Sequence, residues 1–149
     1  MVAGTEEGLE IDGFLGSGAE DDRFIVDIGA GDGANLSNSK RFIDDYGWRA
    51  FRVDGAHGEP DVKAPLVKSW VTAGSIVRLL QEAEVPKDFD ILSLDIDGID
   101  LYVLRKLLVA DYAPSIICFE FNGCRDPRSY HVVQYTDNFK MVGDYYGRS

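Results

Sequence analysis

The sequence has little cysteine and no long apolar run. Its two cysteines, Cys118 and Cys124, have no histidine or further cysteine at zinc-ligand spacing, so we expect neither a zinc site nor a required disulfide. No apolar stretch approaches the length of about 20 residues that a membrane-spanning helix needs. The N-terminus also lacks the basic and apolar segments of a secretory signal. These absences predict a cytoplasmic protein without a membrane partner.

Basic residues are also few, since 15 lysines and arginines face 26 aspartates and glutamates, for a net charge of −11. Residues 1–22 contain seven of these acids, several glycines and no base, which predicts an acidic leader before a domain at 23–149. A negative field repels phosphate, so nucleic acid and anionic lipid are disfavoured as partners.

The apolar patterning predicts strands and helices in alternation. We expect five strands, at 24–28, 49–54, 66–71, 89–96 and 115–121. Three helices are expected between them, at 35–46, 73–84 and 101–110. Thr72 is the expected N-cap of the second helix. Strands that are apolar on both faces, alternating with amphipathic helices, indicate a mostly parallel sheet between two helical layers. Cys118 falls within the last apolar run and is therefore predicted to be a core residue.

A glycine-rich turn follows the first strand. The segment 29–34 (GAGDGA) fits both D-x-G-x-G-x-G, counted from Asp27, and the G-x-G-x-x-A pattern of dinucleotide sites. Asp54 ends the next strand, where a carboxylate can accept hydrogen bonds from ribose hydroxyls. Asp27 and Asp32 would repel a pyrophosphate but suit a cationic ligand, which favours S-adenosylmethionine over NAD; a tight turn without a ligand is the remaining alternative.

A second polar cluster follows the strand at 89–96. Asp95, Asp97 and Asp100 lie there, and Glu120 and Asn122 end the next strand, so these groups are expected at one edge of the sheet. One explanation is structural, with Asp97 or Asp100 capping the following helix or a carboxylate bound by backbone N–H groups. The functional explanations are a general base and, more weakly, a hard-cation site formed by Asp95, Asp97, Glu120 and Asn122.

The two segments together resemble class I S-adenosylmethionine-dependent methyltransferases. Residues 24–33 (FIVDIGAGDG) are similar to motif I of that superfamily, and residues 89–100 (FDILSLDIDGID) with 115–122 (SIICFEFN) resemble its FkbM-type branch. The resemblance implies a Rossmann-like fold and a set of cofactor-binding residues: Asp27, Gly29, Ala30, Gly31, Gly33, Asp54, Gly55, Trp70 and Asp95. It further implies that Asp95 and Asp97 face the transferred methyl group and the substrate, whereas Glu120 and Asn122 are candidate substrate contacts because of their place at the end of the next strand.

These observations predict O-methylation of a small-molecule or sugar-like acceptor, with Asp95 as the base. The alternatives are a non-catalytic S-adenosylmethionine-binding module and an NAD-dependent oxidoreductase. The superfamily sheet continues beyond its fifth strand, whereas residues 124–149 suggest at most one short strand at 131–135. We therefore expect a sheet truncated after the fifth strand, in an abbreviated chain, a fragment, or a homo-oligomer whose second subunit completes the edge.

Overall fold

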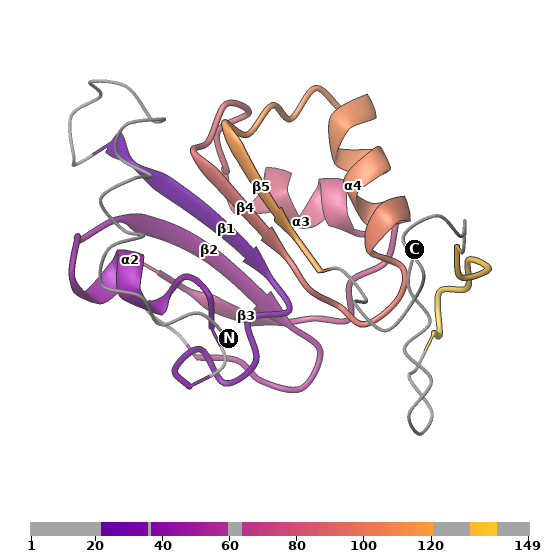
Figure 1. The fold of residues 1–149 in the computed structure, drawn as a ribbon, viewed down its shortest axis with the longest axis horizontal. Helices are drawn as coiled ribbons and strands as arrows, with labels where there is room; N and C mark the ends of the chain where they lie inside the picture. The colour runs from indigo at the N-terminus through magenta and orange to yellow at the C-terminus, as the bar shows by residue number, and fades with distance from the viewer. Residues whose placement is uncertain (1–21, 36, 60–63, 121–131, 140–149) are drawn as a thin grey trace.

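The fold is a five-stranded parallel sheet with helices on both faces (Figure 1). The computed structural model describes residues 22–35, 37–59, 64–120 and 132–139. The elements follow in the order β1 (Phe24–Ile28), α2 (Lys40–Asp44), β2 (Arg49–Asp54), β3 (Leu66–Lys68), α3 (Ile76–Glu82), β4 (Ile91–Leu94), α4 (Asp100–Val109) and β5 (Ile116–Phe119). The predicted α/β class and all five predicted strands are confirmed, although the strands after β2 are shorter than expected.

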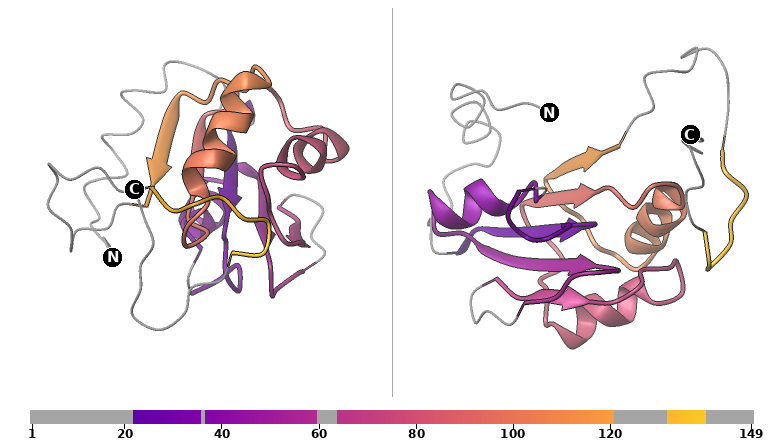
Figure 2. Two further views of the ribbon diagram at one scale, coloured as in Figure 1. Left: turned by 90° about the vertical axis from the view of Figure 1, so that its right-hand side faces the viewer. Right: turned by 90° about the horizontal axis from the view of Figure 1, so that it is seen from below.

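Alternate side chains of the sheet enter two cores. On one face, Val26, Phe51 and Leu92 join a large cluster that includes residues of α3 and α4. On the other face, Ile25, Ala50 and Ile91 pack with Trp48 and with the partly buried side chains of α2. Figure 2 shows the resulting layers. Because β1 and β4 are buried on both faces, they consist almost entirely of apolar residues, as strands in the middle of a parallel sheet usually do.

The helix predicted for residues 35–46 is much shorter in the structure. It begins only at Lys40, because the preceding segment is bound to the sheet: the Ser37 and Ser39 hydroxyls both donate to the Asp27 carboxylate. The helix predicted after Thr72 likewise begins later, at Ile76, with Ser75 at its N-cap. Thr72 instead caps the turn before this helix, where its hydroxyl accepts a hydrogen bond from the Ser75 backbone N–H.

The prediction that Cys118 belongs to the core is wrong. Cys118 lies on β5, which pairs only with β4 among the described residues, and it is exposed on the sheet face where the short helix α2 packs near β1 and β2. Its neighbour Ile117 is also 41% exposed. An apolar run therefore marks a strand here but not a fully buried one, because β5 is the last strand of the sheet within this part of the chain.

Several predictions fall partly or wholly outside the described residues. The acidic leader lies outside except for Asp22, and so do Asn122, Cys124 and His131. Residues 132–135 are not in a strand, so the possible strand at 131–135 is absent from its described part. None of the helices within the described ranges is both long and apolar enough to cross a membrane.

Candidate functional site

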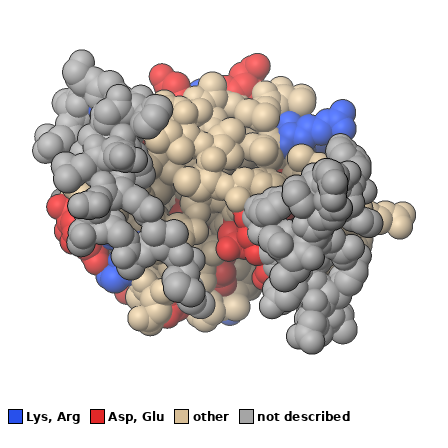
Figure 3. Space-filling model, viewed as in Figure 1, with Lys and Arg blue, Asp and Glu red and all other residues tan. Residues whose placement is uncertain are grey.

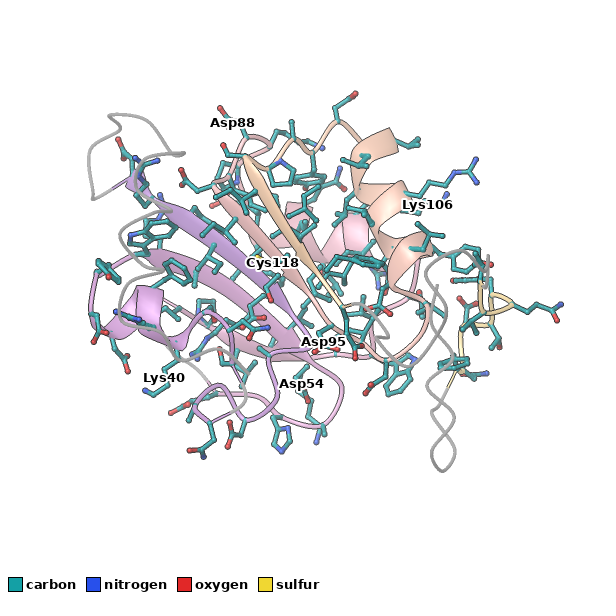
Figure 4. The ribbon with its side chains drawn as sticks, in the orientation of Figure 1. Lys40, Asp54, Asp88, Asp95, Lys106 and Cys118 are labelled. Atoms are coloured by element: carbon teal, nitrogen blue, oxygen red, sulfur yellow. The ribbon has the colours of Figure 1, made fainter. Side chains whose placement is uncertain are left out.

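The candidate site lies at the edge of the sheet where the parallel strands end. The strand order β3-β2-β1-β4-β5 means that the chain winds outward from β1 to β3 and then returns to β4 beside β1. In open parallel sheets, ligands bind at such a switch point, outside the carboxyl ends of the strands. Asp54, the last residue of β2, and Asp95, which directly follows β4, both lie at this edge (Figure 4).

The glycine turn after β1 has a backbone that side chains would obstruct. Gly29, Gly31 and Gly33 all have positive φ angles, of 88°, 56° and 73°. A Cβ atom on Gly29 would lie 1.7 Å from the Asp95 carbonyl oxygen, so the turn can pass the end of β4 only without a side chain. The first glycine is thus explained by packing between β1 and β4, independently of any ligand.

Asp54 connects this turn to the loop after β2. One carboxylate oxygen accepts a hydrogen bond from the Gly31 N–H at 3.1 Å, and the other accepts from the Ala56 and His57 N–H groups at 2.7 and 3.0 Å. Burial raises the pKa of Asp54, but these hydrogen bonds together with one from the His57 ring outweigh burial and lower its pKa below the ordinary value of 3.8. Asp54 is therefore an anion at neutral pH, close to the glycine turn.

Asp27, on β1, is buried and binds the segment that follows the glycine turn. It is 1% exposed, and one of its oxygens accepts hydrogen bonds from the Ser37 hydroxyl and from both the N–H and the hydroxyl of Ser39, at 2.8–3.1 Å. The sequence prediction placed Asp27 around the cofactor. In the structure its hydrogen bonds hold residues 37–39 against the sheet, so Asp27 contributes to the site by fixing the segment that follows the glycine turn.

Arg52 is a supporting residue that the sequence interpretation missed. Its side chain is 6% exposed and donates to the Gly33 carbonyl at 2.8 Å and twice to the Ala64 carbonyl, at 3.2 and 2.6 Å. It lies opposite Asp27 in the parallel register of β1 and β2. A cation between the apolar residues Phe51 and Val53 was the available signal, because a buried guanidinium needs several acceptors.

The N–H groups after the turn are already bonded. The Asp32 carboxylate accepts from the backbone N–H groups of Ala34 and Asn35 at 2.9 and 2.8 Å, and also from the Asn35 side chain. In a dinucleotide site, N–H groups at this position and the start of the following helix bind the pyrophosphate. Here the helix begins only at Lys40, and a carboxylate holds the N–H groups.

Three carboxylates meet at the ends of β4 and β5. Asp95, Asp97 and Glu120 each place an oxygen so that the three ligand atoms lie within 4.8 Å of one another. Figure 3 shows acidic atoms gathered near the end of these strands. The structure thus brings together three of the four residues of the possible cation site; the fourth, Asn122, lies outside the described residues. Oxygen ligands of this kind suit Mg²⁺ or Ca²⁺, and the roles of these acids stay predictions.

The structural explanation holds for Asp100, which is the acidic residue in the first turn of α4 and whose carboxylate is bonded by backbone N–H groups. Ile99, and neither Asp97 nor Asp100, is the N-cap residue of α4. The buried Asp100 carboxylate instead accepts from the N–H groups of Ile96 and Gly98, at 2.8 and 2.7 Å. Asp100 therefore organises the loop that carries Asp95 and Asp97, both of which are exposed.

Trp70 borders the site on the β3 side. Its ring covers Gly55, where an added Cβ would lie 2.8 Å from the indole carbons, and it is 49% exposed. Its indole N–H donates to the Asp137 carbonyl at 2.8 Å. Residues 132–139, hereafter the strap, thereby reach the rim of the site, which no sequence pattern in this segment indicated. The structure thus brings Gly31, Asp54, Gly55 and Trp70 together as predicted neighbours.

Comparisons of the chain with protein-family models, with curated proteins and with solved structures found no match in any of the three.

Proposed function

We propose that this protein binds S-adenosylmethionine at the carboxyl edge of its sheet and transfers a methyl group to an oxygen of a small-molecule or sugar-like acceptor. The observation that carries the proposal is the Asp32 carboxylate on the Ala34 and Asn35 N–H groups. A dinucleotide would have to displace this anion to seat its pyrophosphate, whereas S-adenosylmethionine has no phosphate to place there. The topology of five parallel strands in the order β3-β2-β1-β4-β5 is compatible with the Rossmann-like fold that the sequence resemblance implies.

The residues around the site also fit a ligand with positive charge. Asp54, Asp95 and Asp97 bring carboxylates to one edge of the sheet, while Arg52, the cation beneath the turn, is buried and donates to backbone carbonyls. Carboxylates attract a sulfonium and an ammonium group and accept hydrogen bonds from ribose hydroxyls. Asp54 would accept from the ribose, the glycine turn would border the methionine part, and Trp70 would lie beside the adenine.

When bound, S-adenosylmethionine supplies a methyl group on a positively charged sulfur. Asp95 would take the proton from the acceptor hydroxyl as that oxygen forms its bond to the methyl carbon and the sulfur–methyl bond breaks, with S-adenosylhomocysteine as the leaving group. Asp100 would fix the loop that carries Asp95, since its two oxygens bond the N–H groups of Ile96 and Gly98. Holding base and nucleophile in a fixed geometry is the main contribution that a protein makes to such a displacement.

A transfer assay with isotope-labelled S-adenosylmethionine and a panel of hydroxylated sugars and small alcohols tests this proposal. We expect label on at least one acceptor with the wild type. Asp95→Asn should lower turnover at least about 100-fold, the usual contribution of a general base, while affinity for S-adenosylhomocysteine, which lacks the sulfonium charge near Asp95, stays within about threefold. An Asp95→Asn variant with full activity would refute Asp95 as the base. Binding of S-adenosylhomocysteine without transfer to any acceptor would favour the non-catalytic module.

A further inference from the structure

The strap is attached to helix α4 and to the larger core by its side chains and backbone, and it contacts the loops that contain Gly98 and Trp70. Its Val133 carbonyl accepts a hydrogen bond from the Tyr102 hydroxyl on α4 at 2.8 Å, and the rings of Tyr102 and Tyr135 lie 5.0 Å apart. Tyr135 and Phe139 pack against the larger core cluster. The strap is thus attached by two aromatic side chains, although most of its other residues are exposed.

Phe139 contacts the loop of the candidate base. A Cβ atom on Gly98 would lie 2.2 Å from a ring carbon of Phe139, so the ring lies directly against the glycine. Gly98 follows Asp97, whose own φ of 60° is unusual for a residue with a side chain. The Phe139 ring therefore covers the turn whose conformation determines where Asp97 lies.

The same strap bonds Trp70 two residues earlier, through the Asp137 carbonyl. Tyr135 adds to this attachment: its hydroxyl donates to the Asp137 carboxylate, and this bond together with burial raises the pKa of Tyr135, against smaller opposing hydrogen bonds at Ala73 and Thr72. The indole is thus held between Gly55 on one side and the strap on the other. Trp70 is 49% exposed, and its contact with Gly55 and its bond to the Asp137 carbonyl both limit the rotamers that its ring can adopt.

From these contacts we infer that Phe139 is a positioning residue of the site. It anchors the strap on Gly98, and the anchored strap holds the Trp70 ring in the orientation that borders the cofactor. The consequence for cofactor affinity rests on the proposed function, whereas the consequence for the orientation of Trp70 does not. If loss of the anchor leaves Trp70 correctly oriented about a tenth of the time, the dissociation constant for S-adenosylhomocysteine rises about tenfold.

The test uses ¹⁹F NMR of the full chain labelled with 5-fluorotryptophan. The sequence contains two tryptophans, so Trp70→Phe assigns both resonances, and the buried Trp48 serves as an internal reference. The test variant is Phe139→Ala, and the matched control is Val132→Ala, which shortens an exposed apolar side chain of the same strap. If Phe139→Ala does not fold, Tyr102→Phe is the milder variant, because it keeps the ring but removes the donor to Val133.

We expect the test variant to shift or broaden the Trp70 resonance, to leave that of Trp48 in place and to bind S-adenosylhomocysteine about tenfold more weakly by calorimetry. The control should change neither quantity. An unchanged Trp70 resonance in both Phe139→Ala and Tyr102→Phe would overturn the inference, as would a shifted resonance with unchanged affinity. If the wild type does not bind S-adenosylhomocysteine, the proposed function fails, and the resonance alone decides whether Phe139 positions Trp70.

Discussion

Replacing Asp54 by asparagine changes one atom of a side chain that accepts hydrogen bonds from both sides. Its two oxygens bond Gly31 in the glycine turn and Ala56 and His57 in the loop after β2. In Asp54→Asn the amide oxygen can accept either from Gly31 or from Ala56 and His57, but not from both. The NH₂ group of the asparagine then faces a backbone N–H that it cannot bond. The variant therefore loses a hydrogen bond and all of the negative charge at this position.

The typical strength of a hydrogen bond to a charged group gives the expected size of both effects. Loss of one hydrogen bond to a charged acceptor should lower the free energy of unfolding by about 1.5–3 kcal/mol. In the proposed site, Asp54 also accepts from the ribose, and loss of a comparable charge-assisted bond there weakens binding of S-adenosylhomocysteine about 10- to 150-fold. We expect the second effect to appear in calorimetry at neutral pH and the first in urea unfolding.

The stability effect should depend on pH. The pKa of Asp54 is lowered in the folded protein, so its contribution to stability is present above the unfolded value of 3.8 and is lost as the pH falls through the lower folded value. The difference in unfolding free energy between wild type and Asp54→Asn should accordingly be largest near neutral pH and shrink below about pH 3.8.

Asp88→Asn is the matched control, because Asp88 is exposed and lies at the opposite end of the sheet in Figure 4. It removes the same charge and should leave both affinity and stability near the wild-type values. If Asp54→Asn binds S-adenosylhomocysteine as tightly as Asp88→Asn does, then Asp54 does not bind the ribose and this part of the account is refuted.

Two further substitutions test the support of the glycine turn. Gly29→Ala should destabilise the protein by at least about 2 kcal/mol in thermal unfolding, because its Cβ would lie 1.7 Å from the Asp95 carbonyl oxygen. Gly47→Ala is its control. Gly47 also has a positive φ, of 69°, but apart from its chain neighbours no atom of the described residues lies within 4 Å of its added Cβ, so only the backbone cost of about 1 kcal/mol is expected. Equal losses in the two variants would contradict the packing argument. Arg52→Met should lower the free energy of unfolding by about 2–4 kcal/mol in urea, because the Gly33 and Ala64 carbonyls lose their buried donor; a neutral result would mean that Arg52 does not hold the turn.

Much of the sheet could be predicted because its strands carry a strong local signal. The run from Phe24 to Ile28 and the run ending at Leu94 are apolar on both faces, and glycines mark where the chain turns away from β1. The same local signal failed for Cys118, because apolar composition does not distinguish a central strand from the last strand of a sheet.

The helix after the glycine turn could not be delimited from sequence for a different reason. Its predicted first residues are held by hydrogen bonds outside the helix, in which Ser37 and Ser39 bond Asp27 on the preceding strand, β1. Short polar side chains compete with helix formation in this way, and the competition depends on a partner that is distant in sequence.

The contribution of the strap was also hidden in the sequence. Gly98 follows the strand predicted at 89–96, but nothing local indicates that Phe139 packs on it or that Asp137 bonds Trp70. Phe139 and Gly98 are about 40 positions apart in the sequence, and Asp137 and Trp70 are 67 apart. Residues 132–139 also have no regular secondary structure, so no apolar periodicity predicts where they pack.

Titration calorimetry of the wild-type chain with S-adenosylhomocysteine and, separately, with NAD tests the central claim most directly. The claim is that the Asp32 carboxylate on the Ala34 and Asn35 N–H groups, with the carboxylates of Asp54 and Asp95 nearby, makes this edge a site for a cationic adenosyl cofactor and not for a dinucleotide. We predict saturable binding of one S-adenosylhomocysteine per chain and no binding of NAD. Saturable binding of NAD, with none of S-adenosylhomocysteine, would contradict it.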